Sequence, residues 1–162
     1  MKHNKPGSIV HISSIAAQGP GLLTPVYAAS KAAVSAFVRS LASLETPLDS
    51  SMPKIRVTAV APGTIRTPLL LEAPDKLKRV DEEKDTLIEP EEIADRMLEL
   101  VMRDDYVGGT VLEVGKTHTR KVAVLNDPGP SGPGTTLSNR AKAVEELWDK
   151  LATKGWGEVS QP

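Results

Sequence analysis

The sequence contains no cysteine, so neither a disulfide framework nor a thiolate metal site is open to it. Aromatic residues are scarce too, with two Trp, two Tyr and one Phe among 162 residues. Leu, Val, Ile and Ala must therefore build the core, and a hydrophobic content of 40% is enough for one domain. The lack of cysteine fits a reducing compartment, and we expect a cytoplasmic protein.

Strong net charge and long apolar runs are also missing. The 20 basic and 21 acidic residues leave a net charge of −1, which gives no basic field for nucleic acid or acidic membranes. No apolar run reaches the roughly 18 residues that a membrane helix needs. The histidines His3, His11 and His118 show no ligand spacing. We therefore expect no nucleic-acid partner, no membrane partner and no metal.

The chain does contain an alternation of strand and helix patterns. Short β-branched runs predict strands at 8–13, 55–61 and 110–114, and helical patterns cover 25–44 and 90–103. Such alternation is typical of parallel strands joined by right-handed crossovers. The predicted fold is α/β, with three parallel strands in sequence-adjacent order and helices on both faces. The helix at 25–44 is apolar nearly all round, so we expect it to be buried on two sides.

The rest of the chain carries weaker patterns. Residues 69–85 combine apolar and charged positions, and either a short helix or a mobile lid fits them. We divide the chain into a domain at 1–125 and a second region at 126–162. That region opens with a proline- and glycine-rich loop and continues as an amphipathic helix from Leu137 to Leu151.

A tyrosine and a lysine one helical turn apart are the main chemical signal. Tyr27 and Lys31 stand at i, i+4, so their side chains rise from one face of a helix. An ammonium beside a phenol stabilises the phenolate, which suits a proton donor and acceptor for alcohol–ketone chemistry. Ser14 lies thirteen residues before the tyrosine. A Tyr-x-x-x-Lys pattern alone is weak, because it arises by chance in many proteins.

Three motifs together are far more specific. They are the strand that ends in Ser13-Ser14, the run from Tyr27 to Lys31, and Val60-Ala-Pro62-Gly63-Thr-Ile65-Arg-Thr67-Pro. Their order and spacing resemble the catalytic half of a classical short-chain dehydrogenase/reductase. The resemblance covers most of residues 1 to about 115, and the tail after Asp104 is similar to hydroxyprostaglandin-dehydrogenase-like members. It implies the C-terminal half of a doubly wound, Rossmann-like domain.

The resemblance also implies an activity and a set of residues. The activity is hydride transfer between NAD or NADP and a secondary alcohol or ketone, in a family whose members are commonly homo-oligomers. Tyr27 would act as acid and base, Lys31 would stabilise its phenolate and bond the nicotinamide ribose, and Ser14 would hold the substrate oxygen. Ser13 is the rival serine, less well spaced from the tyrosine. The implied cofactor-binding residues are Tyr27, Lys31, Pro62, Gly63, Ile65 and Thr67, although Thr67 could instead cap a helix before Pro68.

Two family segments have no counterpart in these residues. A Gly-x-x-x-Gly-x-Gly turn and an Asn-Asn-Ala-Gly segment are both missing. In the family they belong to four preceding βα units of about 30 residues each, on the order of 120 residues. A second interpretation is therefore open: an inactive, truncated fragment that serves at most in subunit interaction. We expect the 162 residues alone to bind NAD(H) or NADP(H) weakly, and the sequence specifies neither the substrate nor the choice of dinucleotide.

Overall fold

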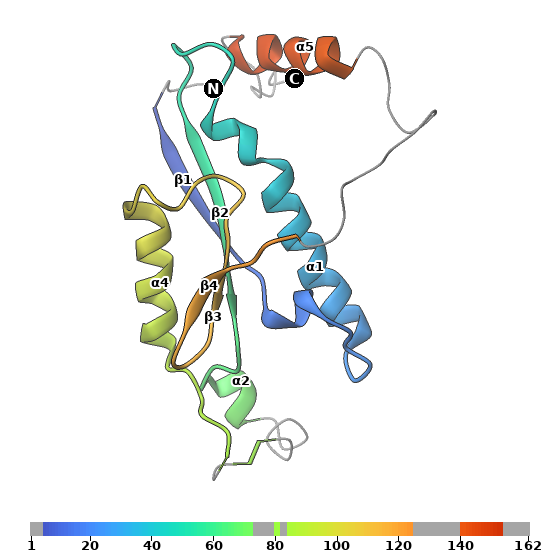
Figure 1. Ribbon diagram of the computed structural model, residues 1–162, viewed down its shortest axis with the longest axis vertical. Helices are drawn as coiled ribbons and strands as arrows, with labels where there is room; N and C mark the ends of the chain where they lie inside the picture. Colours follow the sequence, from blue (N-terminus) through green and yellow to red (C-terminus); the bar gives the residue numbers. More distant parts are fainter. Residues whose placement is uncertain (1–4, 73–79, 82–83, 125–139, 154–162) are drawn as a thin grey trace, which may run out of the picture.

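A computed structural model describes residues 5–72, 80–81, 84–124 and 140–153 (Figure 1). Its sheet has the strand order β1-β2-β3-β4. β1 (Gly7–Ile12), β2 (Ile55–Pro62) and β3 (Val111–Val114) run parallel, which confirms the predicted strands and their order. The short β4 (Thr119–Lys121) pairs antiparallel with β3 and was not predicted. Its three polar residues give no alternating apolar signal that sequence reasoning could use.

Two helices cover the opposite faces of this sheet, as predicted (Figure 1). α1 (Pro25–Ser40) lies on one face and α4 (Pro90–Met102) on the other. α1 ends four residues before the predicted boundary, and a 3₁₀ turn, η2, follows it at Ala42–Glu45. The remaining elements are η1 (Ile15–Gln18), α2 (Pro68–Leu71) and α5 (Arg140–Ala152).

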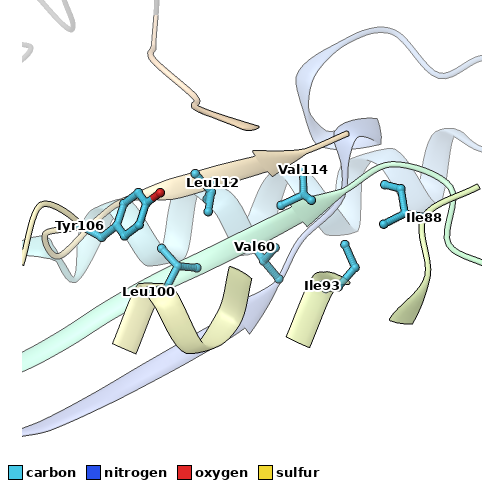
Figure 2. Close-up of a cluster of buried hydrophobic side chains, with 7 residues drawn as sticks. All are labelled: Val60, Ile88, Ile93, Leu100, Tyr106, Leu112 and Val114. Atoms are coloured by element: carbon cyan, nitrogen blue, oxygen red, sulfur yellow. The ribbon is translucent and has the colours of Figure 1, made fainter. Parts of the chain in front are cut away.

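The core consists of two apolar layers, one on each side of the sheet. Because side chains alternate along a strand, β2 sends Val60 towards α4 and Ala59 and Ala61 towards α1. The layer under α4 contains Val60, Ile88, Ile93, Leu100, Tyr106, Leu112 and Val114 (Figure 2). The layer under α1 contains Val38, Val57, Ala59, Ala61 and Val111. Full burial of each larger side chain contributes about 1.5–3 kcal/mol, so both layers hold the strand ends in place.

The expectation that the 25–44 helix is buried on two sides is wrong for the part of the chain that the structure describes. Ser35 and Val38 are the fully buried residues of α1, whereas Val26 is 82% and Phe37 52% exposed. The sheet covers one side of the helix, and no described element covers the other. A helix that is apolar on all sides can be buried on all sides, but the pattern does not show which element packs against each side.

Two predicted segments lie partly outside the described residues. Of the 69–85 segment, 73–79 and 82–83 lie outside, while the short helix α2 occupies its start. The proline- and glycine-rich loop at 126–139 lies outside as well, together with the predicted helix start at Leu137. The rest of that helix is present as α5, with Trp148 buried. Among the described helices, none combines the length and the apolar character needed to cross a membrane.

Candidate active site

The carboxyl ends of the three parallel strands meet at one edge of the sheet, where α/β folds of this kind place their ligands. β1 leads into Ser13-Ser14 and β2 into Gly63, whose N–H donates to the Val114 carbonyl at 2.9 Å. A cavity of about 790 Å³ opens at this edge. Four of the sequence-predicted site residues line it: Ser14, Tyr27, Gly63 and Thr67.

The two adjacent serines point to different surroundings. Ser14 caps η1, since its Oγ accepts a hydrogen bond of 3.2 Å from the Ala16 N–H, and its side chain borders the cavity. Ser13 is only 2% exposed, and its Oγ donates to the backbone carbonyl of Lys31 at 3.0 Å. Consecutive residues in extended backbone face opposite sides, so only one of the pair can reach the cavity. That residue is Ser14.

Tyr27 and Lys31 occupy the first two turns of α1. Tyr27 is 47% exposed and lines the cavity, so its side chain lies outside the packed core. The Lys31 Nζ lies 5.6 Å from the centroid of the Tyr27 ring, within cation–π range. The same ammonium donates to the Ile12 carbonyl at 3.0 Å. Lys31 is not a lining residue of the cavity; its ammonium stands between the end of β1 and the tyrosine.

The candidate cofactor residues after β2 divide into two groups. Thr67 lies at the start of α2, but its side chain makes no capping hydrogen bond and borders the cavity instead. Gly63 also borders the cavity, and an added Cβ there would meet the Ile88 side chain at 3.4 Å. Pro62 and Ile65 do not line it. Pro62 pairs with Val114 at the end of β2, and Ile65 forms a bridge with Ile88 and packs on the core under α4.

The far walls of the cavity are mostly apolar and come from segments that sequence motifs do not mark. Leucine and isoleucine side chains predominate there, namely Leu69, Leu70, Leu87 and Ile88. Two charged residues also contribute, Asp85 and Lys116. Lys116 was not among the candidate site residues that the sequence predicted. Its position directly after the third predicted strand was the available signal, because that strand ends at the same edge.

Lys116 has a carboxylate partner in α4, outside the cavity lining. Its Nζ lies 2.5 Å from Glu92 Oε2, in the first turn of α4. The hydrogen bond from Lys116 and the backbone N–H of Glu89 hold the pKa of Glu92 below its usual range. The pair leaves this side of the cavity close to neutral. Within the described ranges, no three His, Asp or Glu side chains gather as a candidate metal site.

Comparison with known proteins gives this geometry a family. A family model described as short chain dehydrogenase matches residues 1–78. The short-chain dehydrogenase/reductase homolog YusR of Bacillus subtilis is 32% identical over 121 residues, which are 72% of this chain and 88% of YusR. The chain belongs to the short-chain dehydrogenase/reductase family.

Further members of this family show how much of the fold the chain represents. The 15-hydroxyprostaglandin dehydrogenase [NAD(+)] of Rattus norvegicus is 29% identical over 67% of this chain and 43% of its own length. Among solved structures, a 7α-hydroxysteroid dehydrogenase complexed with NADH and 7-oxo glycochenodeoxycholic acid is similar with a TM-score of 0.52. It is 32% identical, and the match covers 67% of this chain and 43% of that one. The chain spans about half the length of most curated relatives it matches.

Proposed function

We propose that the protein is an NAD(P)-dependent oxidoreductase that interconverts a secondary alcohol and a ketone. One observation carries the proposal: Ser14, just after β1, and Tyr27, in the first turn of α1, border the same cavity at the carboxyl edge of the sheet. The Lys31 ammonium lies beside the tyrosine ring. Hydroxyl groups that converge on an open cavity at this edge can hold and deprotonate a substrate alcohol.

Each residue has a distinct task in the oxidation direction. The Ser14 hydroxyl donates to the substrate oxygen and fixes its position. Tyr27, as the phenolate, accepts the proton of the substrate hydroxyl, and the Lys31 ammonium stabilises the negative charge of that phenolate. A bound nicotinamide would accept the hydride from the carbinol carbon. In the reverse direction the Tyr27 phenol returns the proton to the ketone oxygen.

The residues present fit the nicotinamide end of such a cofactor. The Thr67 hydroxyl makes no capping hydrogen bond, and Gly63 has no side chain to cover its backbone at the cavity wall. Pro62 and Ile65 stand on either side of the turn that contains Gly63. Lys31 lies close enough to Tyr27 for its ammonium to reach a ribose bound beside the tyrosine. The two comparison proteins whose names include NAD(+) or NADH support a nicotinamide cofactor without choosing between NAD and NADP.

The apolar walls favour a hydrophobic alcohol as substrate. Leucine and isoleucine side chains predominate on the far walls of the cavity, and the charged Lys116 on its lining is already paired with Glu92. Relatives named for a hydroxyprostaglandin and a hydroxysteroid support the same class. Each additional buried CH₂ of a fitting alcohol should gain about 0.8 kcal/mol, or roughly fourfold in kcat/KM.

A homologous series of secondary alcohols tests this proposal. The protein expressed from its complete reading frame is assayed with NAD+ and NADP+ by the absorbance of the reduced cofactor. We expect kcat/KM to rise with apolar chain length until the cavity is filled. Leu70→Ser should weaken the rise of kcat/KM with chain length. The control Leu98→Ser, at an exposed position of α4 outside the cavity, should leave that rise unchanged. A series that falls with chain length in the wild-type protein would contradict the proposed substrate class.

A specific observation also favours the second function, that of a pairing module. β1 is the last strand on its side of the described sheet, and Ile9 and Ile12 are about half exposed on its two faces. An open strand edge of this kind presents unpaired backbone groups to another strand. Sedimentation and calorimetry on the 162-residue chain separate the two functions. Self-association without measurable NADH binding favours the module, whereas low-micromolar NADH binding by a monodisperse chain favours the enzyme.

A further inference from the structure

Two consecutive residues at the end of β1 hold Lys31, one through its side-chain ammonium and one through its backbone carbonyl. Its ammonium donates to the carbonyl of Ile12 at 3.0 Å, and its backbone carbonyl accepts from the Ser13 hydroxyl at 3.0 Å. Ser13 is in turn anchored to the sheet, because its N–H donates to the Val60 carbonyl at 2.7 Å. The two hydrogen bonds run in opposite directions and link strand and helix at the proposed catalytic lysine.

A second serine completes this arrangement from the helix side. Ser35, one turn after Lys31 in α1, lies with its Oγ 2.8 Å from the Ser13 Oγ. A hydroxyl carries a single proton, and Ser13 uses its proton on the Lys31 carbonyl, so Ser35 must donate to Ser13. A serine in a helix commonly bonds the carbonyl four residues back, which here is that of Lys31. In this protein the Ser13 hydroxyl stands between Ser35 and that carbonyl.

Both hydroxyls lie in the interior, where their hydrogen bonds are costly to lose. Ser13 is 2% and Ser35 4% exposed. A buried hydroxyl without a partner destabilises the fold, so each serine strongly favours the one approach of α1 that satisfies it. That approach fixes where the first two turns of the helix, with Tyr27 and Lys31, lie against the end of β1.

We propose that Ser13 and Ser35 are positioning residues that set the place of the Lys31 ammonium beside Tyr27. The inference rests on the proposed function only in giving Lys31 a catalytic task. The chain of contacts runs from the Ser35 hydroxyl to the Ser13 hydroxyl and then to the Lys31 carbonyl. Neither serine lines the cavity, so neither touches the substrate. Ser13, the alternative to Ser14 in the sequence, thus supports the same site from a buried position outside the cavity.

The test observes Lys31 directly and does not depend on turnover. Lysine amines are dimethylated with ¹³C-formaldehyde, and the Lys31 methyl signal is assigned by its loss in Lys31→Arg. We expect Ser13→Ala to move this signal to the position of exposed lysines, and Ser35→Ala to move it part of the way. Because Ser35 acts through Ser13, the double variant should match Ser13→Ala. Ser40→Ala is the matched control, since the Ser40 hydroxyl donates to the Ala36 carbonyl within the same helix.

The outcomes separate this inference from the proposed function. A wild-type Lys31 signal in folded Ser13→Ala, or an equal displacement in Ser40→Ala, overturns the positioning role. If Ser13→Ala does not fold, the comparison of Ser35→Ala with Ser40→Ala decides in the same way. In the active enzyme, displacement of Lys31 should lower kcat by on the order of a hundredfold. A displaced Lys31 signal in a protein that never oxidises an alcohol would support the positioning role and contradict the proposed function alone.

Discussion

Arg120 and Glu113 form a two-pronged ion pair across β4 and β3. The Arg120 Nε and Nη2 atoms lie 2.9 and 2.7 Å from the two oxygens of Glu113, which is buried in β3. The same Nη2 donates to the Gln18 Oε1 at 3.1 Å, in the 3₁₀ turn that Ser14 caps. The unpredicted strand β4 thereby ties the turn after Ser14 to the sheet, and a carboxylate supplies the anchor.

Stability at acidic pH should depend on this carboxylate. The hydrogen bonds from Arg120, and in smaller part from His118, hold the pKa of Glu113 below its ordinary value of 4.5. A carboxyl whose pKa is lowered by folding contributes stability above its unfolded pKa, and that contribution is lost as the pH falls through the folded pKa. We expect the free energy of unfolding in urea to fall with pH in the wild type, and to fall less in Glu113→Gln. Equal pH dependence of the two proteins between pH 5 and the acid limit, on the order of pH 2, would contradict this assignment.

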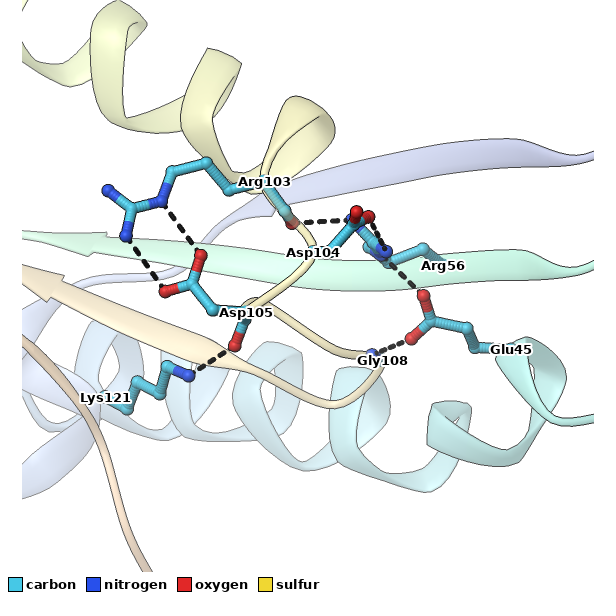
Figure 3. Close-up of polar contacts among 7 residues, drawn as sticks. All are labelled: Glu45, Arg56, Arg103, Asp104, Asp105, Gly108 and Lys121. Carbon is cyan, nitrogen blue, oxygen red and sulfur yellow. Dashed lines mark hydrogen bonds and ion pairs between the residues drawn. The ribbon is translucent and has the colours of Figure 1, made fainter.

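The amino end of β2 is held by Arg56, as Figure 3 shows. Its Nε lies 2.6 Å from Glu45, whose other oxygen accepts from the Gly108 N–H, and its Nη1 donates to the Arg103 carbonyl at 2.9 Å. Because this pair is largely buried, Arg56→Met should lower the free energy of unfolding by about 1–3 kcal/mol. The matched control is Arg66→Met, which breaks an exposed pair with Glu89 and should cost less than about 1 kcal/mol. Chemical denaturation measures the free energy of unfolding of both variants. Equal decreases in the two variants would contradict the stabilising role assigned to Arg56.

A buried hydroxyl without a partner offers a route to higher stability. Thr58 in β2 is fully buried, and its Oγ1 finds no hydrogen-bond partner among the residues that the structure describes. Thr58→Val keeps the shape and removes the unsatisfied group, which should stabilise the fold by about 1 kcal/mol. The control Thr58→Ser keeps the hydroxyl, loses the methyl group and should destabilise. Melting temperatures of the three proteins check the order; a destabilised valine variant would contradict it.

The parallel strands could be predicted because short β-branched runs such as Ile9-Val10 are a local signal in the sequence. The candidate roles of Ser14 and Tyr27 came from the resemblance to the family, and in the structure both residues border one cavity. Lys116 and β4 carried no motif and depend on a turn that brings Gly115 and His118 together. A three-residue polar strand after a short turn leaves no periodic apolar pattern in the sequence.

The surroundings of α1 were the largest error for a related reason. Residues such as Val26 and Phe37 make the helix apolar on all sides, yet the described chain supplies a neighbour on one side only. Composition records what a surface tolerates, whereas burial depends on which element reaches it. The spacing to Tyr27 favoured Ser14 over Ser13, but the contact of Ser13 with the Lys31 carbonyl could be seen only in the structure.

The most direct test of the central claim, that Tyr27 transfers the proton, is the turnover of Tyr27→Phe. The variant and the wild type, both expressed from the complete reading frame, are compared with an apolar secondary alcohol at saturating cofactor. Cofactor affinity is measured separately by calorimetry. We predict that kcat falls by about 10²–10⁴-fold because the phenyl ring cannot accept the proton, while cofactor binding is retained. Turnover of Tyr27→Phe within a few-fold of the wild type would contradict the role assigned to this tyrosine.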